Sequence, residues 1–269
     1  MNPKPHSALV IAAHGSTENE DSSAPTYRHA DTLRSRGCFG EVACCFWKEE
    51  PGYRDVFRML DCDDVYVVPN FISEGYFSRE IIPREMELNG RVTIRGGKTI
   101  KYCDPVGTHA SMTRLLLHRA AEVAPEIPAS ECSLIIVGHG TALNANSAKA
   151  VKEQAAAIGA KSLYGEVLGA YMEEPPLVEK WDEIASNRTV IVVPFFISDG
   201  LHSYQDIPVL LGMESDASPA TSRRAIFRKN PYHLRGRTLY YSSAVGTDPL
   251  MADAIVDQVE AFDRLPIHA

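Results

Sequence analysis

Two histidines in the chain, each followed by glycine, close an apolar run and open a polar one. "VIAAHGSTENED" begins at Val10 and "IIVGHGTALNAN" at Ile135, so His14 and His139 are 125 positions apart, the difference between their residue numbers. Neutral imidazole can ligate a divalent metal ion or exchange a proton near neutral pH. A short, β-branched apolar run is typical of a buried parallel strand. The sequence therefore raises the question of whether the chain carries two working sites or one working site and one relic.

The two histidines belong to an internal duplication. The longest agreement is between "VYVVPNFISEGYFSREIIP" from Val65 and "VIVVPFFISDGLHSYQDIP" from Val190, at the same offset as the two histidines. Further on, "YCDPVGTHASM" from Tyr102 resembles "YSSAVGTDPLM" from Tyr241. The offset there is 139 residues (241 minus 102), which is larger than the offset of 125 between the two histidines. Self-similarity at a fixed offset is the signature of a repeated structural unit.

The growing offset places about 14 extra residues in the second copy, between Pro208 and Thr238. The Pro/Ala/Ser-rich stretch "APEIPASE", residues 124–131, is the expected hinge between the copies. We therefore predict an N-terminal lobe over residues 1–126 and a C-terminal lobe over residues 131–269.

Strands and helices are expected to alternate in each copy. "ALVIAA", "LIIVG", "VYVVP" and "VIVVP" are short apolar runs, whereas "SMTRLLLHRAAEVA", "SAKAVKEQAAAIG" and "PLMADAIVDQVEAF" have helical periodicity. Such alternation predicts parallel sheets with right-handed crossovers. The expected fold class is α/β, with two tandem similar lobes, each a parallel β-sheet flanked by helices. A cleft between the lobes is the expected place for a ligand.

Three polar side chains of the second copy follow three neighbouring strands. His139 ends the first strand, Glu173 follows the second, and "FFISDGLHS" presents His202 after the third. Ligands of open parallel sheets bind at the carboxyl ends of the strands. Two imidazoles and a carboxylate suit divalent Fe, Co, Ni or Zn and leave coordination positions open. We therefore predict that these three residues form a catalytic metal site.

The first copy lacks two of these three donors. His14 is present, but Lys48 stands where the second copy has Glu173, and Phe77 stands where it has His202. A protonated lysine and a phenyl ring cannot ligate a cation, so we expect a degenerate site in this copy. The structural alternatives are a hydrogen-bonded His139, a solvated helix start at Glu173 and a helix cap at His202.

Composition and motifs exclude several function classes. The formal net charge of −8 gives a nucleic-acid partner no overall electrostatic support. No apolar run approaches the roughly 20 residues that span a bilayer, and "MNPKPHSALV" lacks the apolar core of a signal peptide. The six cysteines form no C-x-x-C pair and match no disulfide or zinc pattern, so we expect reduced thiols. We therefore expect a soluble cytoplasmic protein with no nucleic-acid or membrane partner.

Motifs for phosphoryl and acyl transfer are also missing. Ala13 and Gly138 stand where a histidine phosphatase needs arginine before its histidine. There is no G-x-G-x-x-G, Walker loop or G-x-S-x-G nucleophile elbow.

The motifs resemble those of the class II tetrapyrrole chelatases, specifically the CbiX/SirB-type sirohydrochlorin chelatases in their long, fused two-copy form. The resemblance rests on the strand followed by "HG(S/T)", on "YME…P" around Glu173 and on "VVPFFISDGLHSYQDIP", and it covers almost the whole chain. It implies ATP-independent insertion of Co²⁺ or Fe²⁺ into sirohydrochlorin or a related tetrapyrrole, and the His/Glu donor set makes Ni²⁺ a further candidate metal. By position, His139, Glu173 and His202 match the family's metal-binding and proton-accepting residues. We expect no organic cofactor, and a monomer because the two lobes are fused.

A basic segment of the second copy is the candidate for contacts with the substrate's carboxylates. "SRRAIFRKNPYHLRGR", residues 222–237, contains no acidic residue, and arginine suits bidentate recognition of carboxylates. We predict that Arg223, Arg224 and Arg228 bind the tetrapyrrole, with Arg79 and Arg84 as weaker candidates. The alternative is a solvated surface loop.

Two further functions stay open at this point. One is a non-catalytic metal- or tetrapyrrole-binding carrier derived from a chelatase. The other is a chelatase for protoporphyrin or another apolar macrocycle, which would need a more hydrophobic cleft and no basic segment. The sequence leaves open which metal is used and how the base and ligand roles divide among His139, Glu173 and His202.

Overall fold

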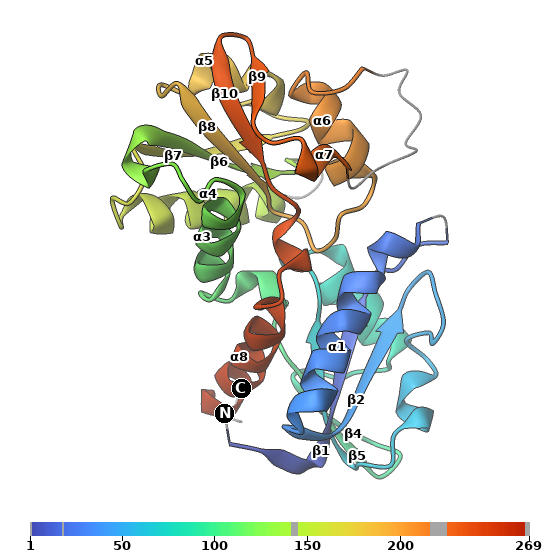
Figure 1. Ribbon diagram of the computed structural model, residues 1–269. Helices are drawn as coiled ribbons and strands as arrows, with labels where there is room; N and C mark the ends of the chain where they lie inside the picture. The colour runs from blue at the N-terminus through green and yellow to red at the C-terminus, as the bar shows by residue number, and fades with distance from the viewer. Residues whose placement is uncertain (1, 18, 141–144, 216–224, 267–269) are drawn as a thin grey trace. The chain divides into compact units, whose positions relative to one another are not determined.

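The computed structural model describes residues 2–17, 19–140, 145–215 and 225–266 and contains two five-stranded sheets (Figure 1). The strand orders are β2-β1-β3-β5-β4 and β7-β6-β8-β10-β9, so the second sheet repeats the first. The first sheet consists of β1 (Lys4–Ala13), β2 (Phe39–Phe46), β3 (Asp64–Pro69), β4 (Val92–Arg95) and β5 (Lys98–Tyr102). The second consists of β6 (Cys132–Gly138), β7 (Glu166–Tyr171), β8 (Thr189–Pro194), β9 (Tyr232–Leu234) and β10 (Arg237–Tyr241). The predicted α/β class with two similar sheets is confirmed.

Each sheet is parallel except at one edge. Strands β4 and β9 pair antiparallel with β5 and β10, and the other pairs of neighbouring strands are parallel. Every residue of the central strand β6 is buried, as is the stretch Ser7–Ala13 of β1. This explains why these strands are continuous apolar runs, since a parallel sheet covered on both faces has no polar side.

Long helices cover one face of each sheet and short helices the other. Helices α1 and α8 contact each other beside the first sheet, and α3 and α4 do the same beside the second. The long helices are α1 (Ala24–Arg36), α3 (Met112–Val123), α4 (Ala145–Gly159) and α8 (Met251–Arg264). The short α-helices are α2 (Ile82–Glu85), α5 (Trp181–Ile184), α6 (Ile207–Leu210) and α7 (Ala225–Arg228). The 3₁₀ and π turns are η1 (Glu20–Ser22), η2 (Val56–Met59), η3 (Phe77–Ile81), η4 (Val106–Thr108), η5 (Ala129–Glu131), η6 (Val178–Lys180), η7 (His202–Asp206) and η8 (Val245–Thr247). In the described residues, no helix has the length and apolar character that crossing a membrane requires.

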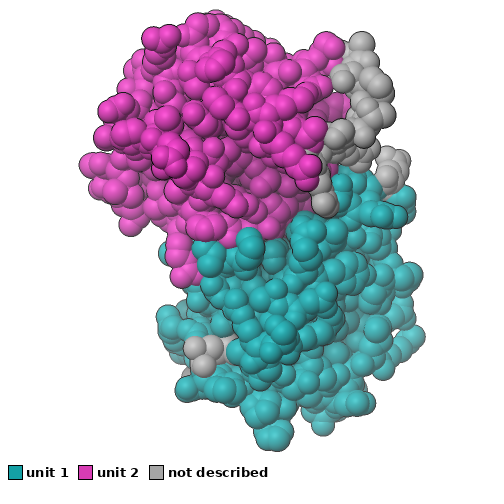
Figure 2. Space-filling model, viewed as in Figure 1, with its two compact units in different colours: residues 1–111, 249–269 teal, residues 112–248 magenta. Residues whose placement is uncertain are grey.

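The compact units of the structure differ from the two sequence copies. Unit 1 consists of residues 1–111 and 249–269, and unit 2 of residues 112–248 (Figure 2). The last helix of each copy therefore packs in the unit built mainly from the other copy, α3 against β8 and α8 against β3. These units have different bounds from the lobes that we predict over residues 1–126 and 131–269.

Equivalent side chains fasten the two exchanged helices. Gln258 of α8 donates from Nε2 to the Pro105 carbonyl at 2.7 Å, and Arg119 of α3 donates from Nη2 to Thr247 Oγ1 at 2.8 Å. Both side chains are buried, and Arg119 and Gln258 occupy equivalent positions of the two copies. The exchange is thus a repeated feature of the duplicated fold.

The helix exchange predicts that a cavity in α8 loosens the sheet of the other sequence copy. Ile255 of α8 and Leu116 of α3 are both fully buried. We expect Ile255→Ala to lower the free energy of unfolding by about 2–4 kcal/mol and to speed backbone hydrogen exchange in β1 and β3. Leu116→Ala, the matched control, should speed exchange in β6 and β8 instead. Faster exchange of β6 and β8 in Ile255→Ala would show that α8 packs on its own copy.

Candidate functional site

The candidate site lies at the carboxyl ends of three adjacent strands. In the order β7-β6-β8, Gly138 at the end of β6 is level with Tyr171, the last residue of β7, and Val137 is level with Pro194, the last residue of β8. His139 follows β6 directly. The strand register therefore brings the segments that follow all three strands to one edge of the sheet.

A glycine turn places His139 against the segment after β7. Gly140 has a φ of +65°, and a Cβ atom there would lie 2.4 Å from Cβ of Tyr171. The His139 carbonyl accepts hydrogen bonds from the backbone amides of Met172, at 3.1 Å, and Glu173, at 3.2 Å. Because these hydrogen bonds hold the two backbone segments together, the side chains lie close to each other, with His139 Nε2 3.6 Å from Glu173 Oε1.

His202 joins this pair from η7, the π turn that follows the loop after β8. Its ring centroid lies 5.1 Å from that of His139, in an edge-to-face arrangement, and 5.6 Å from the ring of Phe196. The structure thus places His139 next to both Glu173 and His202, but the ligand atoms of these three residues do not all lie within 4.8 Å of one another. Their side chains are 32% (His139), 55% (Glu173) and 44% (His202) exposed, so the site is open to solvent.

Asp206 is a further polar neighbour of the candidate site, one that the sequence pattern did not indicate. Asp206 lies four residues after His202 on η7, and its Oδ2 lies 2.6 Å from His202 Nδ1. An ionised carboxylate only accepts, so Nδ1 carries the proton and Nε2 presents its lone pair. A signal was present in the duplication: His202 and Asp206 align with Phe77 and Ile81, so both members of the pair differ in the first copy.

Buried contacts from the turn after β10 hold the segment that carries His202. Asp199 is 8% exposed and accepts a hydrogen bond from the backbone amide of Ala244 at 2.7 Å. Gly246 donates to the Phe196 carbonyl at 2.8 Å, and a Cβ atom at Gly246 would lie 2.1 Å from the Ile197 carbonyl oxygen. The loop and the turn can approach this closely only because residue 246 is glycine.

Thiols are poor candidates for metal ligands in this chain. All six cysteines are free, and four of them are buried. Burial raises the pKa of the Cys44 thiol to about 12 and that of Cys45 well above its ordinary value. Because the thiolate is the form that binds metal, nitrogen and oxygen donors are the groups to consider.

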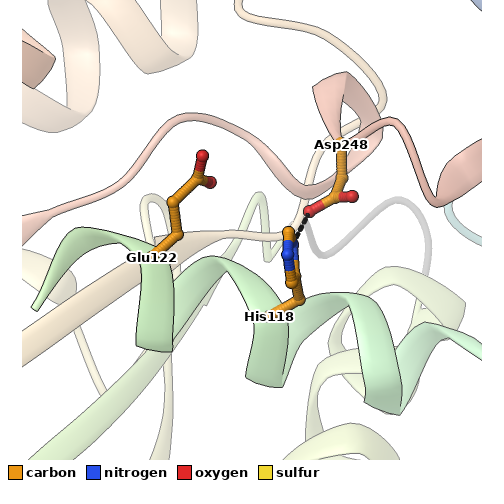
Figure 3. Close-up of side chains that lie close together, drawn as sticks. All are labelled: His118, Glu122 and Asp248. Atoms are coloured by element: carbon orange, nitrogen blue, oxygen red, sulfur yellow. Dashed lines mark hydrogen bonds and ion pairs between the residues drawn. The ribbon is translucent and has the colours of Figure 1, made fainter. Parts of the chain in front are cut away.

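A second group of potential ligands lies elsewhere in unit 2 (Figure 3). Among the described residues, His118, Glu122 and Asp248 are the group whose three ligand atoms all lie within 4.8 Å of one another. Asp248 is fully buried and lies 2.7 Å from His118 Nδ1 and 3.4 Å from Arg119 Nε. Arg119 also pairs with Glu122, at 2.6 Å. The Arg119 guanidinium already pairs with both carboxylates and places a positive charge beside them, so this group ties α3 to the turn after β10 and is poorly suited to a cation.

The equivalent position in unit 1 keeps the backbone and changes the side chains. The His14 carbonyl accepts from the Lys48 amide at 2.9 Å, which is the counterpart of the bond between His139 and Glu173. Phe77 occupies the place of His202, with its ring centroid 4.8 Å from that of His14. Of the three donor positions, only the one occupied by His14 keeps a side chain that can ligate a metal ion.

The basic segment divides between two edges of the second sheet. Phe227 of α7 stacks on Tyr241, at the carboxyl end of β10, with a centroid separation of 5.5 Å. Because β10 runs parallel to β8, this contact places α7 at the same edge of the sheet as the candidate site, and the next residue, Arg228, is exposed there. Arg235 and Arg237 do not lie at this edge. They bond to Asp182 and to the carbonyl of Asn187, near the start of β8 at the opposite edge.

The other predicted arginines have different outcomes. Arg223 and Arg224 lie outside the described residues. In unit 1, Arg79 pairs with Glu74 at 2.6 Å and Arg84 with Glu85 at 2.8 Å. These two guanidinium groups are thus already matched by carboxylates of their own unit.

Comparison with known proteins identifies the family. The sequence profile of the CbiX family matches residues 8–123 and, a second time, residues 133–261. A protein of Halobacterium salinarum named "Probable sirohydrochlorin cobaltochelatase" is 42% identical over 269 residues, covering 93% of this chain and 90% of that protein.

Two solved structures share the fold. A multi-domain protein of Deinococcus radiodurans, described as structurally similar to chelatases, matches with a TM-score of 0.79 and 26% identity over 94% of this chain. This chain spans 54% of that protein's length. The sirohydrochlorin chelatase SirB from Bacillus subtilis subspecies spizizenii, solved in complex with cobalt, matches with a TM-score of 0.64 over 95% of this chain and 94% of its own. At 17% identity, that likeness shows the fold alone. Because the family profile matches both copies and a relative is similar over nearly the full length, this chain belongs to the CbiX family and carries two copies of the family's unit in tandem.

Proposed function

We propose that this chain inserts a divalent metal ion, Co²⁺ or Fe²⁺, into sirohydrochlorin or a closely related tetrapyrrole, without ATP. The observation that carries the proposal is the convergence of His139, Glu173 and His202 at three adjacent strand ends of unit 2. The Halobacterium relative's name supports a tetrapyrrole substrate, and Co²⁺ in particular. Imidazole and carboxylate donors accept several divalent ions, so availability of the metal also decides which is used.

The site's residues suit the two tasks of metal insertion. A free-base macrocycle loses two pyrrole protons when it takes up a divalent ion, so the protein must hold the ion loosely and receive protons. Three protein donors that leave coordination positions open allow the ion to depart, whereas a closed tetrahedral site would retain it. The solvent exposure of all three side chains is consistent with such an open site.

The hydrogen bonds support a division of roles among the three residues. Asp206 holds His202 with Nε2 free to ligate, so we assign His202 as the ligand of fixed orientation and Asp206 as its positioning residue. His139 also contacts the incoming ion, and its Nε2 faces the Glu173 carboxylate at 3.6 Å. We assign the His139–Glu173 pair as the groups that receive the pyrrole protons, because imidazole and carboxylate groups both serve as general bases.

Substitutions in unit 2 should abolish insertion, and the equivalent change in unit 1 should not. We expect His139→Ala and His202→Ala each to lower kcat/KM about 10²–10⁴-fold, the usual contribution of a positioned acid–base group. Glu173→Gln and Asp206→Asn should lower it about 10–100-fold, because they remove a relay or an orienting partner. His14→Ala is the matched control and should keep the wild-type initial rate. The rate is read from the tetrapyrrole absorption spectrum with Co²⁺, Fe²⁺ or Ni²⁺, after subtraction of the spontaneous reaction.

Two results of that assay would contradict the proposal. Wild-type rates in both His139→Ala and His202→Ala would remove the proposed site. Binding of metal and tetrapyrrole without any acceleration over the spontaneous reaction would make the chain a carrier.

Arg228 is proposed to pair with a carboxylate of the substrate, together with Arg223 and Arg224 of the same segment. Arg228→Ala should raise the KM for sirohydrochlorin about three- to fivefold at low salt, with kcat unchanged, because an exposed ion pair contributes modestly and is screened by salt. Arg188 is exposed and precedes β8 at the opposite edge of the sheet, so Arg188→Ala is the matched control. Equal KM values for both variants would exclude a specific contact at Arg228.

A further inference from the structure

The three donors of unit 2 are spaced too widely in the structure to share one ion without a movement. His139 Nε2 and Glu173 Oε1 are 3.6 Å apart, but the ligand atoms of the three residues do not all lie within 4.8 Å of one another. Nitrogen and oxygen ligands lie about 2.1 Å from a divalent transition-metal ion, so two ligands of one ion are at most about 4.2 Å apart. Because the His139–Glu173 pair already meets this limit, His202 is the donor that must move when an ion binds.

The start of the segment that carries His202 has a different hydrogen bond in each copy. In unit 1, Ser78 Oγ accepts from the Gly75 amide at 3.0 Å and donates to the Gly75 carbonyl at 3.2 Å. Serine side chains commonly bond in this way to the backbone three residues earlier. We call this arrangement the closed turn. Gly200 and Ser203 occupy the equivalent positions of unit 2, so the residues that form the closed turn are present in both copies.

In unit 2 the turn is open. Ser203 is fully buried, and its Oγ has no hydrogen-bond partner among the described residues. The Gly200 carbonyl accepts instead from the backbone amides of Ser203 and Tyr204, both at 3.1 Å. A buried hydroxyl without a partner is unfavourable. A movement that restores the bond between Ser203 and Gly200 is therefore favourable.

The copy with the closed turn also has the shorter separation between rings. The ring centroids of His14 and Phe77 in unit 1 are 4.8 Å apart. Those of His139 and His202 in unit 2 are 5.1 Å apart. An imidazole ring is smaller than a phenyl ring, so ring size does not account for the longer separation. We therefore expect closure of the turn in unit 2 to carry His202 toward His139, the direction that coordination requires.

We propose that Ser203 is a positioning residue of the metal site. When an ion binds to the His139–Glu173 pair, the turn that carries His202 moves toward it. Ser203 Oγ then takes up the bond to the Gly200 amide. This bond offsets the cost of moving the turn, so the hydroxyl contributes to metal affinity without touching the ion. The metal site rests on the proposed function, but binding of an ion does not require insertion.

Amide hydrogen exchange tests the movement directly. The probe is Zn²⁺, which is diamagnetic and suits the same donors, and the readout is the NMR spectrum of protein that carries isotopically labelled glycine. Without metal, the Gly75 amide should exchange about tenfold more slowly than the Gly200 amide, because a hydrogen bond protects it. Saturation with Zn²⁺ should slow exchange at Gly200 to a rate near that of Gly75. In the Ser203→Ala variant, exchange at Gly200 should stay fast.

Substitution of the two serines separates positioning from stability. Ser203→Ala should weaken Zn²⁺ binding about three- to tenfold, the effect of one hydrogen bond. The Tm of the metal-free variant should not fall, because the hydroxyl has no partner to lose. Ser78→Ala, the matched control, should lower the Tm and leave Zn²⁺ affinity unchanged. A lower Tm with wild-type Zn²⁺ affinity in Ser203→Ala would show that Ser203 only packs, and would overturn the proposal.

Failure of this inference is distinguishable from failure of the proposed function. Unchanged exchange at Gly200 in a chain that binds Zn²⁺ through His139 and His202 would overturn the movement and leave insertion standing. Protection of Gly200 by Zn²⁺ in a chain that inserts no metal would support the movement and overturn the insertion reaction. Zn²⁺ binding that is unaffected in the His139→Ala/His202→Ala variant would overturn both.

Discussion

The level ends of three parallel strands are the constraint on which the site depends. Hydrogen bonding fixes the order β7-β6-β8, and the register fixes where each strand stops, so the residues that follow must share one edge. The turn at Gly140 and the backbone hydrogen bonds to the His139 carbonyl then bring the side chains of His139 and Glu173 close together. His202 needs a further support, which the turn after β10 supplies by binding the loop that precedes η7.

The duplication shows how far the chemistry of such an edge can change while its backbone stays the same. Both copies have a histidine after the central strand, a positive φ at the next glycine and the same backbone bond to the segment after the neighbouring strand. Exchanging Glu173 and His202 for Lys48 and Phe77 turns a set of cation donors into a surface of one imidazole, aromatic rings and an ammonium group. Because the last helix of each copy packs in the unit built mainly from the other copy, each compact unit contains residues of both copies.

The sequence predicted the features that strand patterning controls and missed those set by tertiary contacts. Buried parallel strands are continuous apolar runs, so the sheets and the grouping of the three donors followed from the pattern. The amphipathic pattern of α8 shows that it packs, but not against which sheet, so the helix exchange was not predicted. Asp206 was missed because its role depends on one π turn that points it at His202. The basic segment was treated as one surface, whereas the β9–β10 hairpin carries Arg235 and Arg237 to the far edge.

The central claim is that His139 and His202 share one metal ion in unit 2. X-ray absorption spectroscopy of the wild-type protein loaded with one equivalent of Co²⁺ measures this directly, because imidazole gives a distinctive outer-shell scattering pattern. We predict two imidazole nitrogens with additional oxygen donors around cobalt, and loss of both imidazoles in the His139→Ala/His202→Ala variant. A cobalt environment without imidazole in the wild type, or one that is unchanged in the double variant, would contradict the claim.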